Sequence, residues 1–257
     1  MSRLAPTLLW FVVGTTVACG HESARMTARD SEVQPVPAGD RILSVQANIG
    51  EDGNFDGTLD EARRAGSEAQ VLPVDWNTIE TAPGTFEPPT DLLAIANAYY
   101  PDRGIPIHLI VRPIHTNQKV VPADLVDAAI DAPETIVRFK RLLDWVATRI
   151  PRITLTSLSI GSEVDIYMWG DSTRWDAWTT FYAAVAPYAR GKFPGTLISC
   201  ETTQAAFVGP DRERLRRLHQ FSDAIGVSYY PMENGLHGVR PPSAVHGDFA
   251  GLRKRRG

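Results

Sequence analysis

An acidic residue directly follows a short apolar run in the middle of the chain. Residues 158–165 read Leu-Ser-Ile-Gly-Ser-Glu-Val-Asp, so small side chains lead into Glu163. In a parallel sheet such a run predicts a buried strand that delivers one carboxylate to the open end of the sheet, where catalytic groups gather. A carboxylic acid that is partly shielded from water at such a place can donate a proton to a reacting group. We therefore take Glu163 as the candidate catalytic residue; the alternative is a structural or solvated loop acid.

Other side chains with suitable chemistry follow predicted strand ends. Arg112 could orient a carboxylate or pair with a structural acid, and His115 could bind hydroxyl groups or only satisfy its own loop. Glu201, which follows the predicted strand at 196–200, is the candidate second carboxylate. Of Tyr229 and Tyr230, one should face the open end of the sheet and the other should pack, because neighbours in a strand point to opposite sides.

Composition and spacing exclude several other kinds of site. The net charge is −4, and the chain lacks the basic footprint that a nucleic-acid partner would require. The 6 His are scattered without a His-Glu-x-x-His spacing, so no metal is expected. No Gly-rich phosphate loop and no Gly-x-Ser-x-Gly elbow is present, so we expect neither a cofactor nor a serine nucleophile.

Residues 1–19 have the layout of a lipoprotein-type signal peptide. Arg3 precedes an apolar stretch at residues 8–13 that is too short to span a membrane, and small residues then lead to Cys19. We expect Cys19 to be the acylated residue, so that the exported protein is anchored to the outer or cytoplasmic membrane of a bacterium. Ordinary secretion and a cytoplasmic N-terminus are the alternatives.

Residues 20–40 are polar and aperiodic and are interpreted as a flexible linker, so the folded domain should cover residues 41–257. Within it, apolar runs alternate with helical patterns, which predicts parallel strands joined by helices. The predicted strands are 42–47, 69–74, 105–111, 153–160, 196–200 and 224–228. The predicted helices are 59–65, 91–100, 133–150, 172–191 and 211–221, and a long loop is expected at 75–90. The aromatic stripe of the helix at 172–191 should face the core.

The alternation predicts an α/β fold of the TIM (β/α)8-barrel type that is incomplete, with about six strand–helix units. A closed barrel of this type needs eight. The residues after Pro231 are rich in Gly and Pro and leave no room for two further units of about 30 residues each. We therefore expect a truncated barrel or, failing that, an open sheet.

Three motifs stand in order along the predicted strands. Residues 76–80, Trp-Asn-Thr-Ile-Glu, are followed by Pro-Gly-Thr-Phe at 83–86; Gly-Ser-Glu at 161–163 ends the fourth strand; and residues 223–231 read Asp-Ala-Ile-Gly-Val-Ser-Tyr-Tyr-Pro. Together they resemble the large clan of retaining glycoside hydrolases with (β/α)8 barrels, which includes endo-β-1,4-galactanases, β-galactosidases and cellulases. The similarity covers residues 42–231.

The resemblance implies that the chain hydrolyses O-glycosidic bonds in β-linked polysaccharide by a retaining two-carboxylate mechanism, with Glu163 as acid/base. It also implies substrate contacts at Tyr229 or Tyr230, at Ser162, where the family has Asn, and at Trp76, which would stack on a sugar ring or close the bottom of the pocket. The family's nucleophile is a Glu at the end of a seventh strand. No residue here inherits that role, so an inactive product is one expected outcome.

Two other interpretations stay open. One is a non-catalytic surface lipoprotein that binds sugar or acts as a scaffold on a decayed barrel. The other is an open-sheet enzyme that uses Glu163 together with Glu201. In all cases a barrel that lacks strands leaves exposed parallel edges, so poor solubility or oligomerisation is expected.

Overall fold

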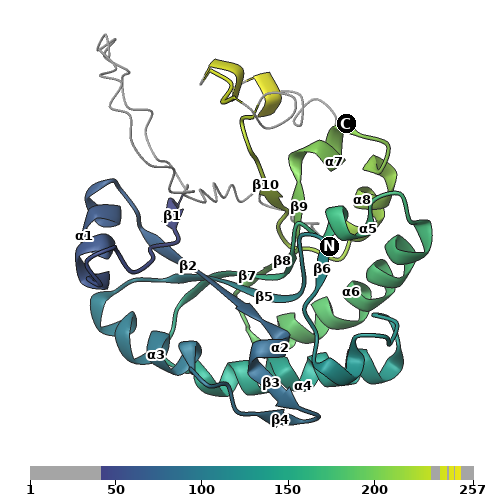
Figure 1. The fold of residues 1–257 in the computed structure, drawn as a ribbon, viewed down its shortest axis with the longest axis horizontal. Coiled ribbons are helices and arrows are strands. Elements are labelled where there is room, and N and C mark those ends of the chain that lie inside the picture. The colour runs from purple at the N-terminus through teal and green to yellow at the C-terminus, as the bar shows by residue number, and fades with distance from the viewer. Residues whose placement is uncertain (1–41, 233–237, 242, 246, 250–257) are drawn as a thin grey trace, which may run out of the picture.

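The computed structural model describes residues 42–232, 238–241, 243–245 and 247–249. Cys19, the predicted signal peptide and the predicted linker therefore lie outside the described residues. Strands and helices alternate along the chain as predicted (Figure 1). The strands are β1 (Ser44–Val45), β2 (Ala69–Asp75), β3 (Glu80–Ala82), β4 (Thr85–Phe86), β5 (Ile107–His115), β6 (Gln118–Lys119), β7 (Leu155–Ser162), β8 (Leu197–Ser199), β9 (Glu201–Thr203) and β10 (Gly226–Ser228). The helices are α1 (Phe55–Arg64), α2 (Trp76–Ile79), α3 (Leu92–Tyr99), α4 (Pro133–Arg149), α5 (Val164–Met168), α6 (Ser172–Lys192), α7 (Gln204–Val208) and α8 (Arg212–His219).

The central sheet is parallel and follows chain order. Its strands run β1-β2-β5-β7-β8, with β6 paired antiparallel to β5 at one end. Strands β9 and β10 form a parallel pair, and only Cys200 separates β9 from β8 in the chain. This order is that of a (β/α)8 barrel, and over the described residues the sheet does not close on itself. The prediction of an incomplete barrel is confirmed.

Helices α3, α4 and α6 lie along one side of the sheet (Figure 1). Apolar side chains of β5 and β7 that face these helices are fully buried, Leu109 and Leu158 among them. The aromatic stripe of α6 joins this core, with the indole of Trp178 stacked on the ring of Phe181 at 5.2 Å between centroids. The predicted core-facing role of this stripe is therefore confirmed.

The opposite face of the sheet carries small polar side chains. His108 of β5 pairs with Ser157 of β7, and Ser159 of β7 pairs with Ser199 of β8. All four are buried. Because side chains alternate along a strand, this polar face is the one turned away from the helices, and it leads toward the strand ends at which Glu163 lies.

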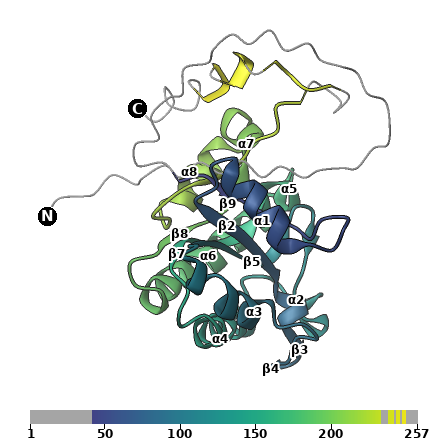
Figure 2. The same ribbon diagram turned by 90° about the vertical axis from the view of Figure 1, so that its left-hand side faces the viewer.

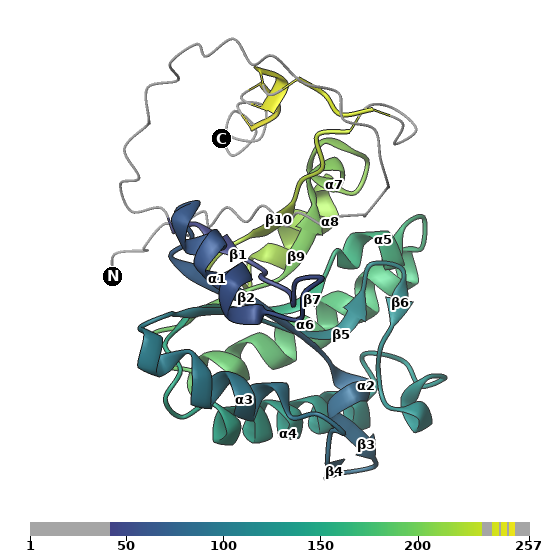
Figure 3. The same cartoon turned by 60° about the vertical axis from the view of Figure 1, so that its left-hand side comes forward.

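The stretch at 75–90 is not the long loop that its composition predicts. It forms helix α2 and a hairpin of β3 and β4. Trp76 and Ile79 are buried, and the ring of Phe86 stacks on Trp145 of α4 at 5.8 Å; Figures 2 and 3 show the hairpin beside α4. Both pieces are short, so their order comes from contact with α4 rather than from local sequence.

Two features of these elements have local causes. Pro73 lies inside β2, where its missing amide is tolerated because β1 pairs only with Ala69 and Gln70 and ends before it. Helix α6 takes Asp171 as its N-cap, since the Asp171 carboxylate accepts the first free amides of the helix. Over the described ranges, no helix is both long and apolar enough to cross a membrane.

Candidate active site

Glu163 lies at the tip of β7, between the last strand residue and helix α5. Its backbone is left-handed with φ 52°, and Thr116, in the turn between β5 and β6, has φ 54°; both are strained conformations for residues with a β-carbon. The Thr116 hydroxyl donates to Glu163 Oε2 at 3.0 Å, and its amide donates to the carbonyl oxygen of Ser162 at 2.9 Å. The two strained turns therefore hold each other and fix the direction of the carboxylate. Figure 3 shows α5 and β6 at the same end of the sheet.

Tyr230 covers the other oxygen of this carboxylate. Its hydroxyl donates to Glu163 Oε1 at 2.5 Å. Tyr230 is 44% exposed while Glu163 is 7% exposed, so the ring lies over the acid and faces solvent on its other side. Burial, the hydrogen bond to Glu163 and the charges of Glu163 and Glu201 raise the pKa of Tyr230 above its ordinary value. The hydroxyl thus stays protonated as a donor.

A second carboxylate belongs to the same cluster. Glu201 is the first residue of β9 rather than a loop residue beyond a strand, and it is 3% exposed. Its Oε2 accepts a hydrogen bond from Ser162 Oγ at 2.9 Å, and its Oε1 lies 3.2 Å from Nε2 of His108. Nδ1 of His108 lies 2.6 Å from Ser157 Oγ. Ser162 therefore connects the strand end that carries Glu163 to a buried Glu-His-Ser chain below it.

The side chain of Glu201 has room only because β10 carries glycine opposite it. Gly226 pairs with Glu201, and a β-carbon there would lie 2.6 Å from Cγ of Glu201. A neighbouring contact comes from Asp165 in α5, whose carboxylate accepts from the amide and hydroxyl of Thr203 at 2.8 and 2.6 Å. Burial raises the pKa of Asp165 against these two donors. Asp165 thus joins α5, which follows Glu163, to β9, which carries Glu201.

Arg112 and His115 extend the cluster along β5. Arg112 Nε donates to Asp75 Oδ1 at 2.6 Å, and its Nη1 lies 3.4 Å from His115 Nε2. Arg112 therefore pairs with an acid at the end of β2, the second of the two roles left open for it. His115 belongs to β5, which extends past Val111 because β6 pairs back onto its end.

The pKa of His115 should lie below its ordinary value. Burial lowers the pKa of His115 from 6.5, the positive charge of Arg112 lowers it further, and the charges of Asp75, Glu163 and Glu201 act in the opposite direction. The unfolded chain then binds this proton at a higher pH than the folded protein, so stability falls as the pH decreases below about 6.5. We expect an NMR titration of the imidazole to show a midpoint below 6.5. His115→Gln should reduce the decrease in the free energy of unfolding that occurs as the pH is lowered. A midpoint at or above 6.5 contradicts this.

Trp76 and Tyr229 are buried, which fits the alternatives to substrate contact that were left open for them. Trp76 is 0% exposed, donates from Nε1 to Glu80 and packs edge-on against Phe139, so neither ring face is open to a sugar. Tyr229 is buried, and its hydroxyl donates to Asp248 Oδ2 at 2.6 Å, away from Glu163. In both cases the motif is present, but the short α2 turn and the strand alternation point these rings elsewhere.

Three members of the cluster were missed from the sequence, namely His108, Ser157 and Thr116. His108 stands four residues before Arg112 in a predicted strand, which places both on one face of the sheet; that spacing could have indicated it. Ser157 and Thr116 reach the cluster only because of the register between β5 and β7. That register cannot be predicted from the local sequence. Among the described residues, no group of three or more His, Cys, Asp or Glu could hold a metal ion.

Comparison with known proteins gives matches at the level of structure. No protein-family model matches the sequence, and no curated protein matches it. An exo-β-1,4-mannosidase from Opitutaceae bacterium strain TAV5 superposes with a TM-score of 0.57 at 17% identity, over 70% of this chain and 35% of that chain. A β-glucosidase superposes with a TM-score of 0.53 at 14% identity, over 76% and 63%. A family 39 glycoside hydrolase from the gut symbiont Bacteroides cellulosilyticus WH2 gives 0.53 at 16% identity, over 74% and 38%.

These matches concern the fold. The chain spans 35%, 63% and 38% of the lengths of the three solved chains, which is less than two thirds of each. All three are glycoside hydrolases by description. The chain therefore has the fold of the (β/α)8-barrel glycoside hydrolases, in an open form over the described residues.

Proposed function

We propose that this protein is a glycoside hydrolase that cleaves β-linked polysaccharide, with Glu163 as the acid/base. The single observation that carries the proposal is the position of Glu163. Its carboxyl group is nearly buried at the C-terminal tip of β7, beneath the half-exposed ring of Tyr230 and beside a second carboxylate, Glu201. In (β/α)8 barrels this end of the sheet carries the chemistry.

The chemistry requires two carboxyl groups with different tasks. One donates a proton to the departing glycosidic oxygen, and the other faces the anomeric carbon, where positive charge develops. Glu163 has two hydroxyl neighbours, which can donate or accept as its proton comes and goes. Glu201 instead is 3% exposed and is held by the Ser162 hydroxyl and the His108 imidazole. Glu163 borders the half-exposed Tyr230, which supports Glu163 as the group that meets the departing oxygen.

We further propose a retaining mechanism. The resembled clan takes its nucleophile from a seventh strand, and the described residues contain no such strand; the second carboxylate that they do contain near Glu163 is Glu201. In this chain Glu201 is then the nucleophile that forms the bond to the anomeric carbon as the leaving oxygen takes the proton of Glu163, and water hydrolyses the resulting ester. NMR of the first-formed sugar distinguishes the two outcomes, because a retaining enzyme releases the β-anomer from a β-glycoside and an inverting enzyme releases the α-anomer.

The test of the function is turnover by the purified protein. Aryl β-glycosides of glucose, mannose and galactose and the corresponding β-1,4-linked oligosaccharides form the panel. Hydrolysis of at least one substrate supports the proposal, and Glu163→Gln then identifies the acid. Binding of these oligosaccharides without cleavage would instead support the non-catalytic sugar-binding protein, which is the second candidate.

We also propose that the protein is exported and lipid-anchored through Cys19, on the basis of the residues that precede it. Growth of the expressing bacterium with labelled palmitate should give a labelled protein in the membrane fraction. Cys19→Ser should remove the label, and a wild-type chain that takes up none would contradict the anchor.

A further inference from the structure

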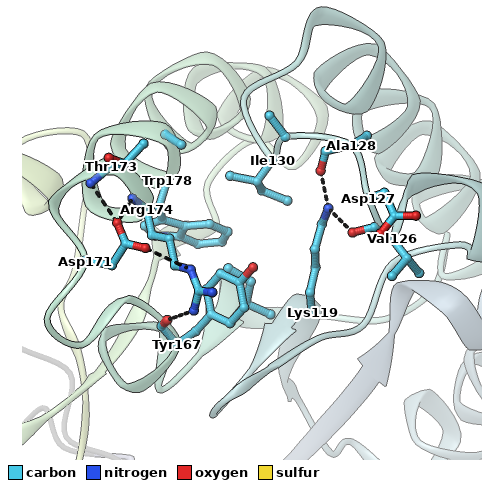
Figure 4. Close-up of a pocket in the computed structure, with 13 residues that line it drawn as sticks. Lys119, Val126, Asp127, Ala128, Ile130, Tyr167, Asp171, Thr173, Arg174 and Trp178 are labelled. Atoms are coloured by element: carbon cyan, nitrogen blue, oxygen red, sulfur yellow. Dashed lines mark hydrogen bonds and ion pairs between the residues drawn. The ribbon is translucent and has the colours of Figure 1, made fainter.

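A pocket of about 390 Å³ lies beside the candidate active site, between the segment after β6 and the start of α6 (Figure 4). Tyr167 of α5 and Arg174 and Trp178 of α6 lie on one side of the gap, and Lys119 and Ile130 lie on the other. Its volume is within the range of small-molecule sites, which is roughly 300 to 1,000 Å³.

The wall of the pocket that the segment after β6 forms is held in place by hydrogen bonds of Lys119. The ammonium of Lys119 donates to the carbonyl oxygens of Leu125 at 2.7 Å and Val126 at 3.0 Å, and also to that of Ala128. These bonds use the three donors of the ammonium, so Lys119 fixes this wall and has no donor left for a ligand. Apart from Asp127, the side chains that this wall presents are apolar, namely those of Val126, Ala128, Ala129 and Ile130.

The facing side is also pre-arranged. Arg174 donates from Nη1 to the carbonyl oxygen of Tyr167 at 2.9 Å, lies over the Tyr167 ring at 4.6 Å, and pairs through Nε with Asp171 at 3.2 Å. Over the part of the chain that the structure describes, no hydrogen-bond partner occurs for the hydroxyls of Tyr167 and Thr173 or for the carboxylate of Asp127. The rim therefore offers two hydroxyls that no described residue binds and one carboxylate, that of Asp127, whose charge acts on Lys119.

The lining fits a neutral ring with several hydroxyl groups. The charges at the pocket balance, with Lys119 and Arg174 against Asp127 and Asp171, so a strongly charged ligand is not favoured. Apolar walls suit the C–H faces of a sugar ring, and the free hydroxyls and carboxylate suit its O–H groups.

Both walls of the pocket are joined to the surroundings of Glu163 by short stretches of chain. Tyr167 stands four residues after Glu163 in a helical segment, which is a rise of about 6 Å. On the other side, Thr116, which binds the Glu163 carboxylate, is three residues from Lys119 across the β5–β6 turn. A sugar chain whose scissile bond lies at Glu163 can therefore reach the pocket with another of its units.

We propose that this pocket is a binding site for a further sugar unit of the polysaccharide whose cleavage is assigned to Glu163. The inference rests on the proposed function for the identity of the ligand, and it implies that the preferred substrate is an oligosaccharide and not the glycoside of a single sugar. Trp178 and Ile114 form the buried floor, and the contacts to the sugar come from the rim.

Two substitutions test the pocket without touching the catalytic cluster. Ala177→Leu fills it from α6, and Tyr167→Phe removes one hydroxyl while it keeps the ring beneath Arg174. Ala184→Leu is the matched control, because Ala184 is a half-buried alanine two helical turns further along α6 that does not line the pocket. Circular dichroism of each variant checks that the fold is kept.

Binding is measured by calorimetry with β-1,4-linked hexasaccharides of glucose, mannose and galactose, in a Glu163→Gln background that prevents cleavage. We expect Ala177→Leu to weaken binding about tenfold or more and Tyr167→Phe about fivefold, and Ala184→Leu to leave it unchanged. In the active protein, kcat/KM for the hexasaccharide should fall by the same factors while that for the aryl β-glycoside stays constant.

The outcomes separate this inference from the proposed function. If binding depends on Ala177 and Tyr167 but the protein has no hydrolytic activity, the pocket is supported as a sugar site and the proposed enzymatic function is contradicted. If the protein hydrolyses a substrate but wild type, Tyr167→Phe and Ala177→Leu bind the hexasaccharide with equal affinity, the enzymatic function is supported and the sugar site in the pocket is overturned. Absence of binding to all three hexasaccharides would also overturn the pocket.

Discussion

Glu163→Gln is expected to lower kcat/KM for ordinary aryl β-glycosides by about 100- to 10,000-fold, the usual contribution of a general acid. Glutamine has nearly the shape of glutamate and still offers an oxygen and an amide to the hydroxyls of Thr116 and Tyr230. The two strained turns around residue 163 should therefore persist. The lost quantity is the proton, which the amide cannot supply to the leaving oxygen.

The leaving group provides a sharper readout than the rate alone. A dinitrophenolate departs without protonation, whereas an alkyl or sugar oxygen needs the acid. Glu163→Gln should therefore be far less damaging with a dinitrophenyl glycoside than with an oligosaccharide. A defect of folding would reduce both rates by the same factor.

Glu213→Gln is the matched control for this experiment. Glu213 lies on α8 and is exposed, so its charge is far from any described contact of Glu163. We expect unchanged kinetics in that variant. Turnover by Glu163→Gln equal to that of the wild type would remove Glu163 from the mechanism, and the sugar-hydrolase proposal with it.

The strand tip that carries Glu163 could be predicted from the sequence because its signal is local. An apolar run that ends in Gly161, Ser162 and Glu163 predicts a strand tip, and β7 ends at Ser162 in the structure. The stripe of α6 is local in the same sense, since helical spacing alone places Trp175 and Trp178 in the core. Both predictions depend on one element and its own periodicity.

The partners of the acid could not be found in this way. Thr116 reaches Glu163 only because β5 shifts register against β7 between Val111 and His115, and such shifts are set by the packing of the whole sheet. Trp76 shows the opposite case. Its motif resembles that of a catalytic barrel, but the indole is turned inward by α2, and its donor is used by Glu80. The motif there has a structural role, and its energetics can be tested.

Arg138→Met is expected to lower the free energy of unfolding by about 3–5 kcal/mol, the usual effect of removing one partner from a buried ion pair. Glu80 is 1% exposed and accepts hydrogen bonds from Arg138 Nε at 3.0 Å and Nη2 at 2.7 Å. It also accepts from Trp76 Nε1 and from the amide of Gly84, both at 2.6 Å. Methionine keeps the apolar stem of the side chain but leaves the Glu80 carboxylate buried without its cation.

Urea unfolding followed by circular dichroism measures this change, with Arg141→Met as the matched control. Arg141 lies three residues further along α4 and is exposed, so its loss should change stability by less than about 0.5 kcal/mol. Because Glu80 also anchors Trp76 and the β3–β4 hairpin against α4, the hairpin should become the first segment to exchange its amides in Arg138→Met. Equal unfolding midpoints for the two variants would mean that the Glu80 carboxylate is satisfied without Arg138, and that the packing of Trp76 on Phe139 maintains this corner.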